Sequence, residues 1–185
     1  MDDVGTDVQG IAEINKPWNV QTKLSYQTQL DLLCNTTRVP YSPATAEHDI
    51  TYQPRGTVLI VAGTAAGRSQ ILGHNDMGQF CWHALQGEWY EEIIFITAYI
   101  VWHVASDNAG PHTAYTQQYA AMRDAGTINP NTRRQQLQDL SNLIEKKREE
   151  GYRPVLMMDA NGDYKDKNSD DTGLENFIQA SGFVD

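Results

Sequence analysis

Short apolar runs alternate with amphipathic segments along the chain, and this alternation predicts an α/β fold. Runs rich in β-branched and apolar residues predict strands over residues 8–14, 56–62, 93–102 and 154–158. Apolar residues at helical spacing, together with helix start and stop signals, predict helices over residues 24–33, 113–124, 134–150 and 172–181. A further strand is predicted to begin at Phe183.

The helix over residues 134–150 has the clearest signals. Leu137, Leu140, Ile144 and Lys147 fall on one stripe, with a proline before the helix and a glycine after it. A basic cluster lies at its carboxyl end, where cations complement the helix dipole. We therefore interpret the cluster as structural rather than as a nucleic-acid contact.

Length and composition are those of one globular domain. The 185 residues can form one core, and 40% of them are hydrophobic. The longest apolar run, residues 93–104, is interrupted by Thr97 and His103 and is too short to cross a bilayer. No basic segment precedes an apolar stretch at the amino terminus, so we expect an intracellular protein, cytoplasmic or nuclear, that does not bind membranes. Cys34 and Cys81 are then expected to be buried thiols.

The charge balance is strongly acidic. The chain has 14 basic and 24 acidic residues, with a net charge of −10 and an isoelectric point near 4.8. This balance argues against tight, passive binding of nucleic acid, because such binding depends mainly on neutralising phosphates. An acidic protein can still act on phosphates when divalent cations mask its carboxylates.

Glu13 is an acid in the otherwise apolar run 8–14. A carboxylate at the carboxyl end of a strand, where α/β folds place their ligands, is well placed to hold a hard cation. An acid at a strand end can equally point to water, and position alone does not separate these two interpretations.

Asp159 and Asn161 follow the predicted strand 154–158. In an extended segment, two residues separated by one lie on the same side of the chain. The acid could then polarise a water while the amide orients a phosphate oxygen. Asp-x-Asn-Gly is also favourable turn chemistry, so a plain turn is the alternative.

The same residues allow a calcium-loop interpretation. Asp159, Asn161 and Asp163 occupy positions one, three and five of such a loop, and Asp170 occupies position twelve. However, Tyr164 stands at position six, where glycine is needed, and a strand rather than a helix precedes the loop. The pattern is therefore weak support for a calcium-binding helix–loop–helix.

Tyr99 lies near the end of the strongest predicted strand. Its hydroxyl could donate to a phosphate, although a core aromatic is the default for a single tyrosine in a strand. Other motifs are weaker. The segment 63–69 lacks the lysine and the spacing of a phosphate-binding loop, and none of the five histidines shows metal-ligand spacing.

Taken in order, these segments resemble the endonuclease/exonuclease/phosphatase superfamily, which has the DNase-like fold, and most closely its retroelement-associated endonuclease-like sequences. The run with Glu13 resembles the strand whose glutamate holds the catalytic metal, and the run with Tyr99 resembles the strand with the active-site tyrosine. Asp159 and Asn161 match the acid and the amide of the family's G-D-x-N signature, with Met158 in place of the glycine. The resemblance implies a Mg²⁺- or Mn²⁺-dependent phosphodiester hydrolase, an endonuclease acting on nucleic acid.

The resemblance also implies a two-sheet α/β sandwich of four αββα layers, in which residues 1–185 form a single, incomplete domain. The family has a first strand and last strands, carrying further site residues, that find no counterpart in this sequence, so we expect a chain truncated at both ends. A catalytically dead relative that serves as a structural subunit or binding module is the alternative function. Missing strands would leave sheet edges open, so we expect a protein partner or an oligomer.

Overall fold

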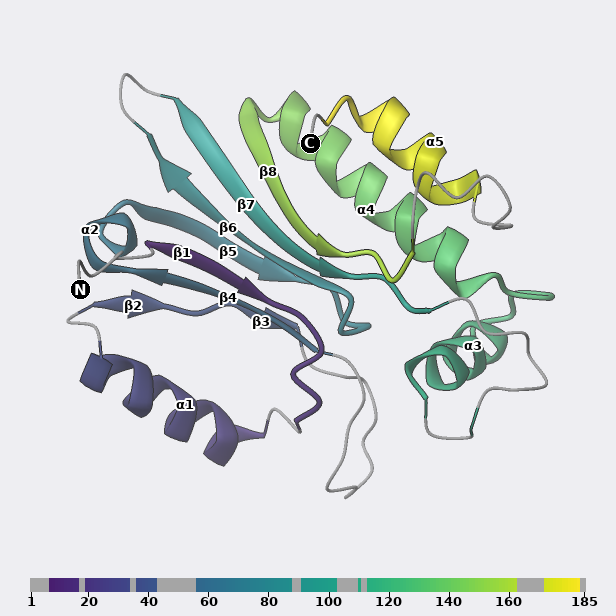
Figure 1. Ribbon diagram of the computed structural model, residues 1–185, viewed down its shortest axis with the longest axis horizontal. Coiled ribbons are helices and arrows are strands. Elements are labelled where there is room, and N and C mark those ends of the chain that lie inside the picture. Colours follow the sequence, from purple (N-terminus) through teal and green to yellow (C-terminus); the bar gives the residue numbers. More distant parts are fainter. Residues whose placement is uncertain are drawn as a thin grey trace.

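Two four-stranded sheets pack face to face and carry helices on their outer sides (Figure 1). The computed structural model describes residues 7–16, 19–33, 36–42, 56–87, 91–102, 110, 113–162 and 172–183. In these ranges the predicted αββα sandwich is confirmed.

The first sheet is built around β4 (Thr57–Ala62), which is buried along its whole length. β1 (Val8–Ile11) pairs with one side of β4, and β2 (Thr37–Arg38) and β3 (Tyr41–Ser42) pair with the other, all antiparallel. A run of β-branched and apolar residues suits this central position, because both faces of β4 are covered.

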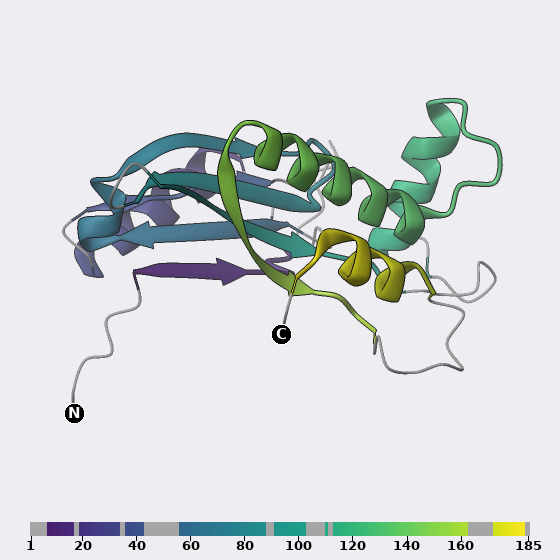
Figure 2. The same ribbon diagram turned by 90° about the horizontal axis from the view of Figure 1, so that it is seen from above.

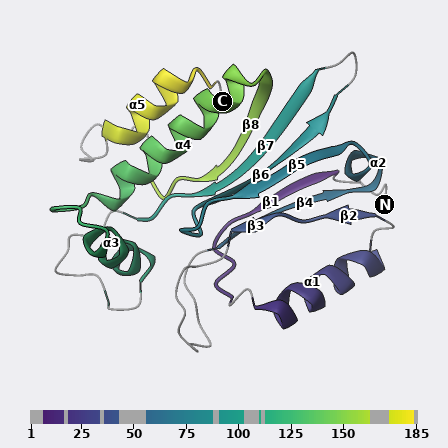
Figure 3. The same ribbon diagram turned by 180° about the vertical axis from the view of Figure 1, so that it is seen from behind.

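Helix α1 (Val20–Leu33) covers the outer face of the first sheet, on the side of the sandwich opposite to α4 and α5 (Figure 3). Tyr26 and Leu30 pack against the core residues of β4 on this face. The predicted apolar stripe is therefore only partly correct: Leu30 faces the sheet, whereas Leu24 and Leu33 are exposed.

The second sheet has the strand order β5-β6-β7-β8. Its strands are β5 (Ser69–His74), β6 (Phe80–Gln86), β7 (Glu92–Tyr99) and β8 (Tyr152–Asp159). All neighbours are antiparallel except β7 and β8, which run parallel. A single helical turn, α2 (Gly63–Ala66), joins the two sheets between β4 and β5.

A long crossover connects the parallel strands β7 and β8. It contains α3 (Ala114–Asp124) and α4 (Thr132–Glu149), and α5 (Thr172–Ser181) follows β8. Figure 2 shows α4 and α5 side by side along the second sheet. The predicted stripe of α4 is confirmed: Leu137, Leu140, Ile144 and Lys147 are its inward side chains, and the first three join the core of this layer. None of the helices in the described ranges is long and apolar enough to cross a membrane.

Several expected boundaries are corrected. β1 ends at Ile11, so Glu13 lies two residues beyond the strand rather than inside it. Phe183 belongs to no strand. The segment 63–69 contains α2 and the start of β5. Cys81 is buried as expected. Cys34, Asp163, Tyr164 and Asp170 lie outside the described residues.

Candidate active site

β1, β7 and β8 end at the same end of the sandwich (Figure 1). The four residues singled out from the sequence lie at or just beyond these strand ends. Tyr99 is the last residue of β7 and Asp159 the last residue of β8, and the parallel register places them side by side. Asn161 follows two residues later. Glu13 reaches the same point from the other sheet, because it lies just beyond the end of β1.

The Tyr99 hydroxyl is the centre of this group. Tyr99 is only 6% exposed, and the side chains of Glu13, Asp159 and Asn161 all act on its hydroxyl. Burial, the Glu13 carboxylate and the Asp159 carboxylate raise the pKa of Tyr99 above its usual range, and the Asn161 side chain opposes them. The phenol is therefore protonated at neutral pH.

Asn161 is fixed by two hydrogen bonds. Its side-chain nitrogen donates to the carbonyl oxygen of Ile100 at 3.0 Å, and its backbone N–H donates to Asp159 Oδ1 at 3.2 Å. The Asn161 side chain also acts on the Tyr99 phenol and lowers its pKa. Because a side-chain amide has two hydrogens, one can serve Ile100 while the other donates to a second acceptor.

Two of the four residues have unfavourable backbone angles. Glu13 has φ of +53° and Asn161 has φ of +45°. Asparagine tolerates this left-handed region, but glutamate rarely adopts it. Such conformations persist only where the surroundings over-determine them, and they concentrate at functional sites.

A small hydrophobic cluster packs around the residues that carry the site. Tyr99, Val101 and Ala114 form its buried part, and Ala12, the residue before Glu13, packs against them. Two residues earlier, Gly10 lets β1 lie directly on β7: a Cβ added there would be 2.5 Å from Thr97 Oγ1. The close contact between the two sheets thus places Glu13 beside Tyr99.

The donor chemistry fits a hard divalent cation. The side chains of Glu13 and Asp159 are exposed, and both carboxylates act on the same phenol. Mg²⁺ is commonly bound by one or two carboxylates, with waters and substrate phosphates completing its shell. Among the described residues there is no group of three or more acidic, histidine or cysteine ligands. The site therefore fits a cation that is shared with water and substrate.

The other candidates have structural roles. Lys147, in the basic cluster of α4, bonds Glu150 at 2.6 Å. His83 is fully buried between the sheets, and its Nε2 lies 2.6 Å from Ser69 Oγ. Burial, with a smaller contribution from the charge of Arg38, lowers the pKa of His83 to about 4.

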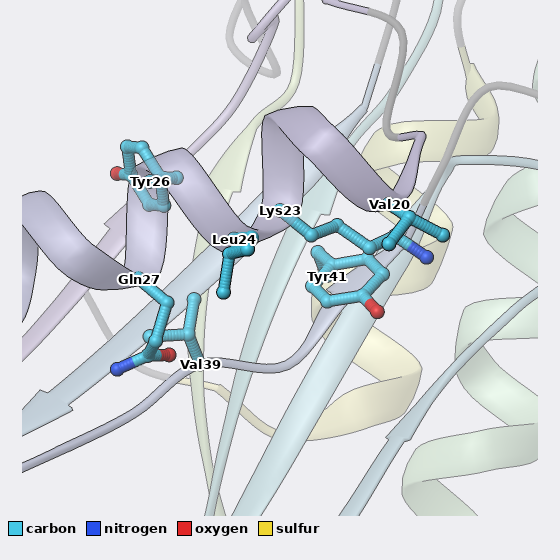
Figure 4. A pocket seen from close by; sticks show the side chains of 7 residues that line it. All are labelled: Val20, Lys23, Leu24, Tyr26, Gln27, Val39 and Tyr41. Atoms are coloured by element: carbon cyan, nitrogen blue, oxygen red, sulfur yellow. The ribbon is translucent and has the colours of Figure 1, made fainter.

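A pocket of about 460 Å³ lies between α1 and the segment that leads into β3 (Figure 4). Lys23 Nζ lies 4.3 Å from the centre of the Tyr41 ring there. The lining residues are Val20, Lys23, Leu24, Tyr26, Gln27, Val39 and Tyr41. None of the four candidate residues lines this pocket. The candidate active site is therefore a different place, where β1, β7 and β8 end.

The sequence interpretation missed two polar residues at the start of α4, Arg133 and Gln136. Both are buried and bond the backbone that follows β7. A signal existed: Arg133 lies four residues before Leu137 and so continues the inward stripe of α4. The predicted helix began at residue 134, one residue too late to include it.

Comparison with solved structures identifies the fold. The catalytic domain of human Nocturnin, solved with a bound sulfate anion, superposes with a TM-score of 0.54 at 12% sequence identity. The match covers 95% of this chain and 56% of that domain, so the chain spans little more than half its length. No family model and no curated protein matches the sequence. The chain therefore shares the two-sheet α/β fold of the Nocturnin catalytic domain.

Proposed function

We propose that this protein is a metal-dependent phosphodiester hydrolase that acts on nucleic acid. The observation that carries the proposal is the convergence of Glu13, Asp159 and Asn161 on the hydroxyl of Tyr99, a residue that is only 6% exposed. Two acids, an amide and a protonated phenol at one point supply a cation ligand, a base and two donors for phosphate oxygens.

The four side chains divide the chemistry. Glu13, with Asp159 beside it, would hold Mg²⁺ or Mn²⁺, which neutralises charge that develops on the phosphoryl oxygens. Asp159 would accept a proton from the attacking water. The Asn161 amide and the Tyr99 hydroxyl would donate to phosphate oxygens and hold the phosphorus in line with that water. The raised pKa of Tyr99 keeps its donor hydrogen in place.

The net charge supports a cation-dependent site. A chain with a net charge of −10 repels a polyanion, so carboxylates that face a phosphate need a cation between them. The fold is also compatible with the proposal, because the Nocturnin domain that it resembles is described with a bound sulfate, a tetrahedral oxyanion.

Nicking of supercoiled plasmid tests the proposal. We expect nicking that requires Mg²⁺ or Mn²⁺ and stops when EDTA is added. Asp159→Asn should reduce the rate about a hundredfold or more, because a positioned general base contributes about 10²–10⁴. Asp124→Asn, which removes an exposed acid at the end of α3, is the matched control and should leave the rate unchanged.

The open sheet edges support an alternative function as a binding module. In the described ranges, β1 and β8 each pair with one neighbour only, and both lie at the edge of their sheets. An intracellular partner, or a second copy, could pair with such an edge. Folded protein that fails to nick plasmid would overturn the hydrolase proposal and favour this one.

A further inference from the structure

Arg133 lies beneath the strand ends that carry the candidate active site. It is the second residue of α4 and is only 3% exposed. Its Nη1 donates to the carbonyl oxygen of Val101 and to that of Ala160, each at 2.8 Å. Val101 lies two residues after Tyr99, and Ala160 stands between Asp159 and Asn161. One guanidinium nitrogen therefore joins the backbone beyond β7 to the backbone beyond β8.

Gln136 completes the contact from the next turn of α4. Its Oε1 accepts from the backbone N–H of Val101 at 2.9 Å, and its Nε2 donates to Gln118 of α3 at 2.7 Å. Both glutamines are fully buried. The N–H and the C=O of Val101 are thus both bonded to α4, so the exit of β7 is fixed on the helix.

We propose that Arg133 is a positioning residue of the proposed active site, which fixes the exits of β7 and β8 so that Tyr99, Asp159 and Asn161 keep their geometry. This inference rests on the proposed function. Asn161 has a left-handed backbone, and the bond from Arg133 to the preceding carbonyl holds the chain where it enters this conformation. A planar guanidinium can bond two carbonyls in a fixed direction, whereas the ammonium of lysine is a compact charge on a flexible stem.

The test uses Arg133→Met and Arg133→Lys, with Ile144→Val as control because Ile144 is buried on the same face of α4 far from the strand ends. The first readout is hydrogen exchange of the Ile100 amide, which donates to the Asp159 carbonyl at 2.9 Å, relative to the Ile96 amide in the middle of β7. The second is the kcat and KM of oligonucleotide cleavage.

We expect the Ile100-to-Ile96 exchange ratio to rise about tenfold or more in Arg133→Met and less in Arg133→Lys, because only the strand exits are released. The kcat should fall about a hundredfold with little change in KM, since a small misplacement of reacting groups has this cost. Ile144→Val should change neither the ratio nor kcat.

An unchanged exchange ratio in Arg133→Met would overturn the positioning role, whatever happens to cleavage. If the wild-type protein cleaves nothing, the proposed function fails, and the exchange ratio still decides whether Arg133 fixes these strand ends. A fall in kcat that appears equally in Ile144→Val would also contradict the proposal, because it would reflect general loss of stability.

Discussion

At the scale of single residues, the site combines favourable chemistry with unfavourable backbone geometry. Glu13 has a left-handed backbone, which costs a non-glycine residue about 1–2 kcal/mol, and asparagine is better suited to it. We expect Glu13→Asn to leave the free energy of unfolding unchanged or raise it by up to about 1 kcal/mol, while metal-dependent cleavage is lost. Urea unfolding and plasmid nicking check the two effects. A clear loss of stability would mean that Glu13 serves the fold rather than the reaction.

His83 makes the stability of the fold depend on pH. Its pKa is lowered to about 4 in the folded protein, whereas an unfolded histidine protonates near 6.5. Between these pH values the unfolded chain binds more protons than the folded protein. The contribution of neutral His83 to the free energy of unfolding is therefore complete above pH 6.5 and is lost as the pH falls toward 4. The loss is about 3 kcal/mol. Urea unfolding at pH values from 7.5 to 4.5 gives the free energy of unfolding as a function of pH. This free energy should fall less steeply with decreasing pH in His83→Gln than in the wild type, and an equal pH dependence would contradict this reasoning.

The residue chemistry of the site could be predicted from the sequence, but its assembly could not. Asp159 and Asn161 stand in a recognisable order after a strand, Glu13 and Tyr99 were singled out by their positions in predicted strands, and the resemblance to a known family gave all four their roles. Glu13 follows a strand of one sheet and Tyr99 ends a strand of the other, so no local sequence pattern encodes the interaction between them. Arg133 was missed because helix ends are the least certain part of a sequence-based prediction.

At the scale of elements, the site depends on how closely β1 lies on β7. A Cβ at Gly10 would be 2.5 Å from Thr97 Oγ1, so Gly10→Ala must push the two strands apart. We expect a loss of about 1–3 kcal/mol in the free energy of unfolding and reduced cleavage, because Glu13 moves with β1. Gly67→Ala is the matched control: its φ is ordinary and its nearest neighbour is 3.4 Å away. Equal stability of both variants would contradict the close contact.

The elements themselves were predicted unevenly. The strands β4, β7 and β8 and the strongly periodic α4 were found, because a run of β-branched and apolar residues or a sustained stripe gives a clear pattern. The strands β2 and β3 have only two residues each, too few for any periodicity. β5 and β6 were also missed: β5 has a register shift and mostly exposed or half-buried positions, which weakens its alternation.

At the scale of the whole molecule, the edge strand β8 is the main opportunity for association. Val155 on this strand is 42% exposed, so it can contact another chain. A charged side chain on an edge strand disfavours pairing with another chain. We expect the protein to self-associate or bind a partner, and Val155→Lys to weaken this association. Gln29→Lys on α1 adds the same charge elsewhere and should not. Sedimentation velocity checks the prediction, and a wild-type protein that stays monomeric at high concentration and binds no partner would contradict it.

The central claim is that Glu13, Tyr99, Asp159 and Asn161 act as one metal-dependent site. The most direct measurement is the single-turnover rate of phosphodiester cleavage in Mg²⁺ for Glu13→Gln, Asp159→Asn and the double variant. Residues that act as a unit are strongly non-additive, so the account predicts that the double variant loses little more than the worse single variant. Losses that simply multiply, or a Glu13→Gln variant with the wild-type rate, would show that these side chains do not form a common site.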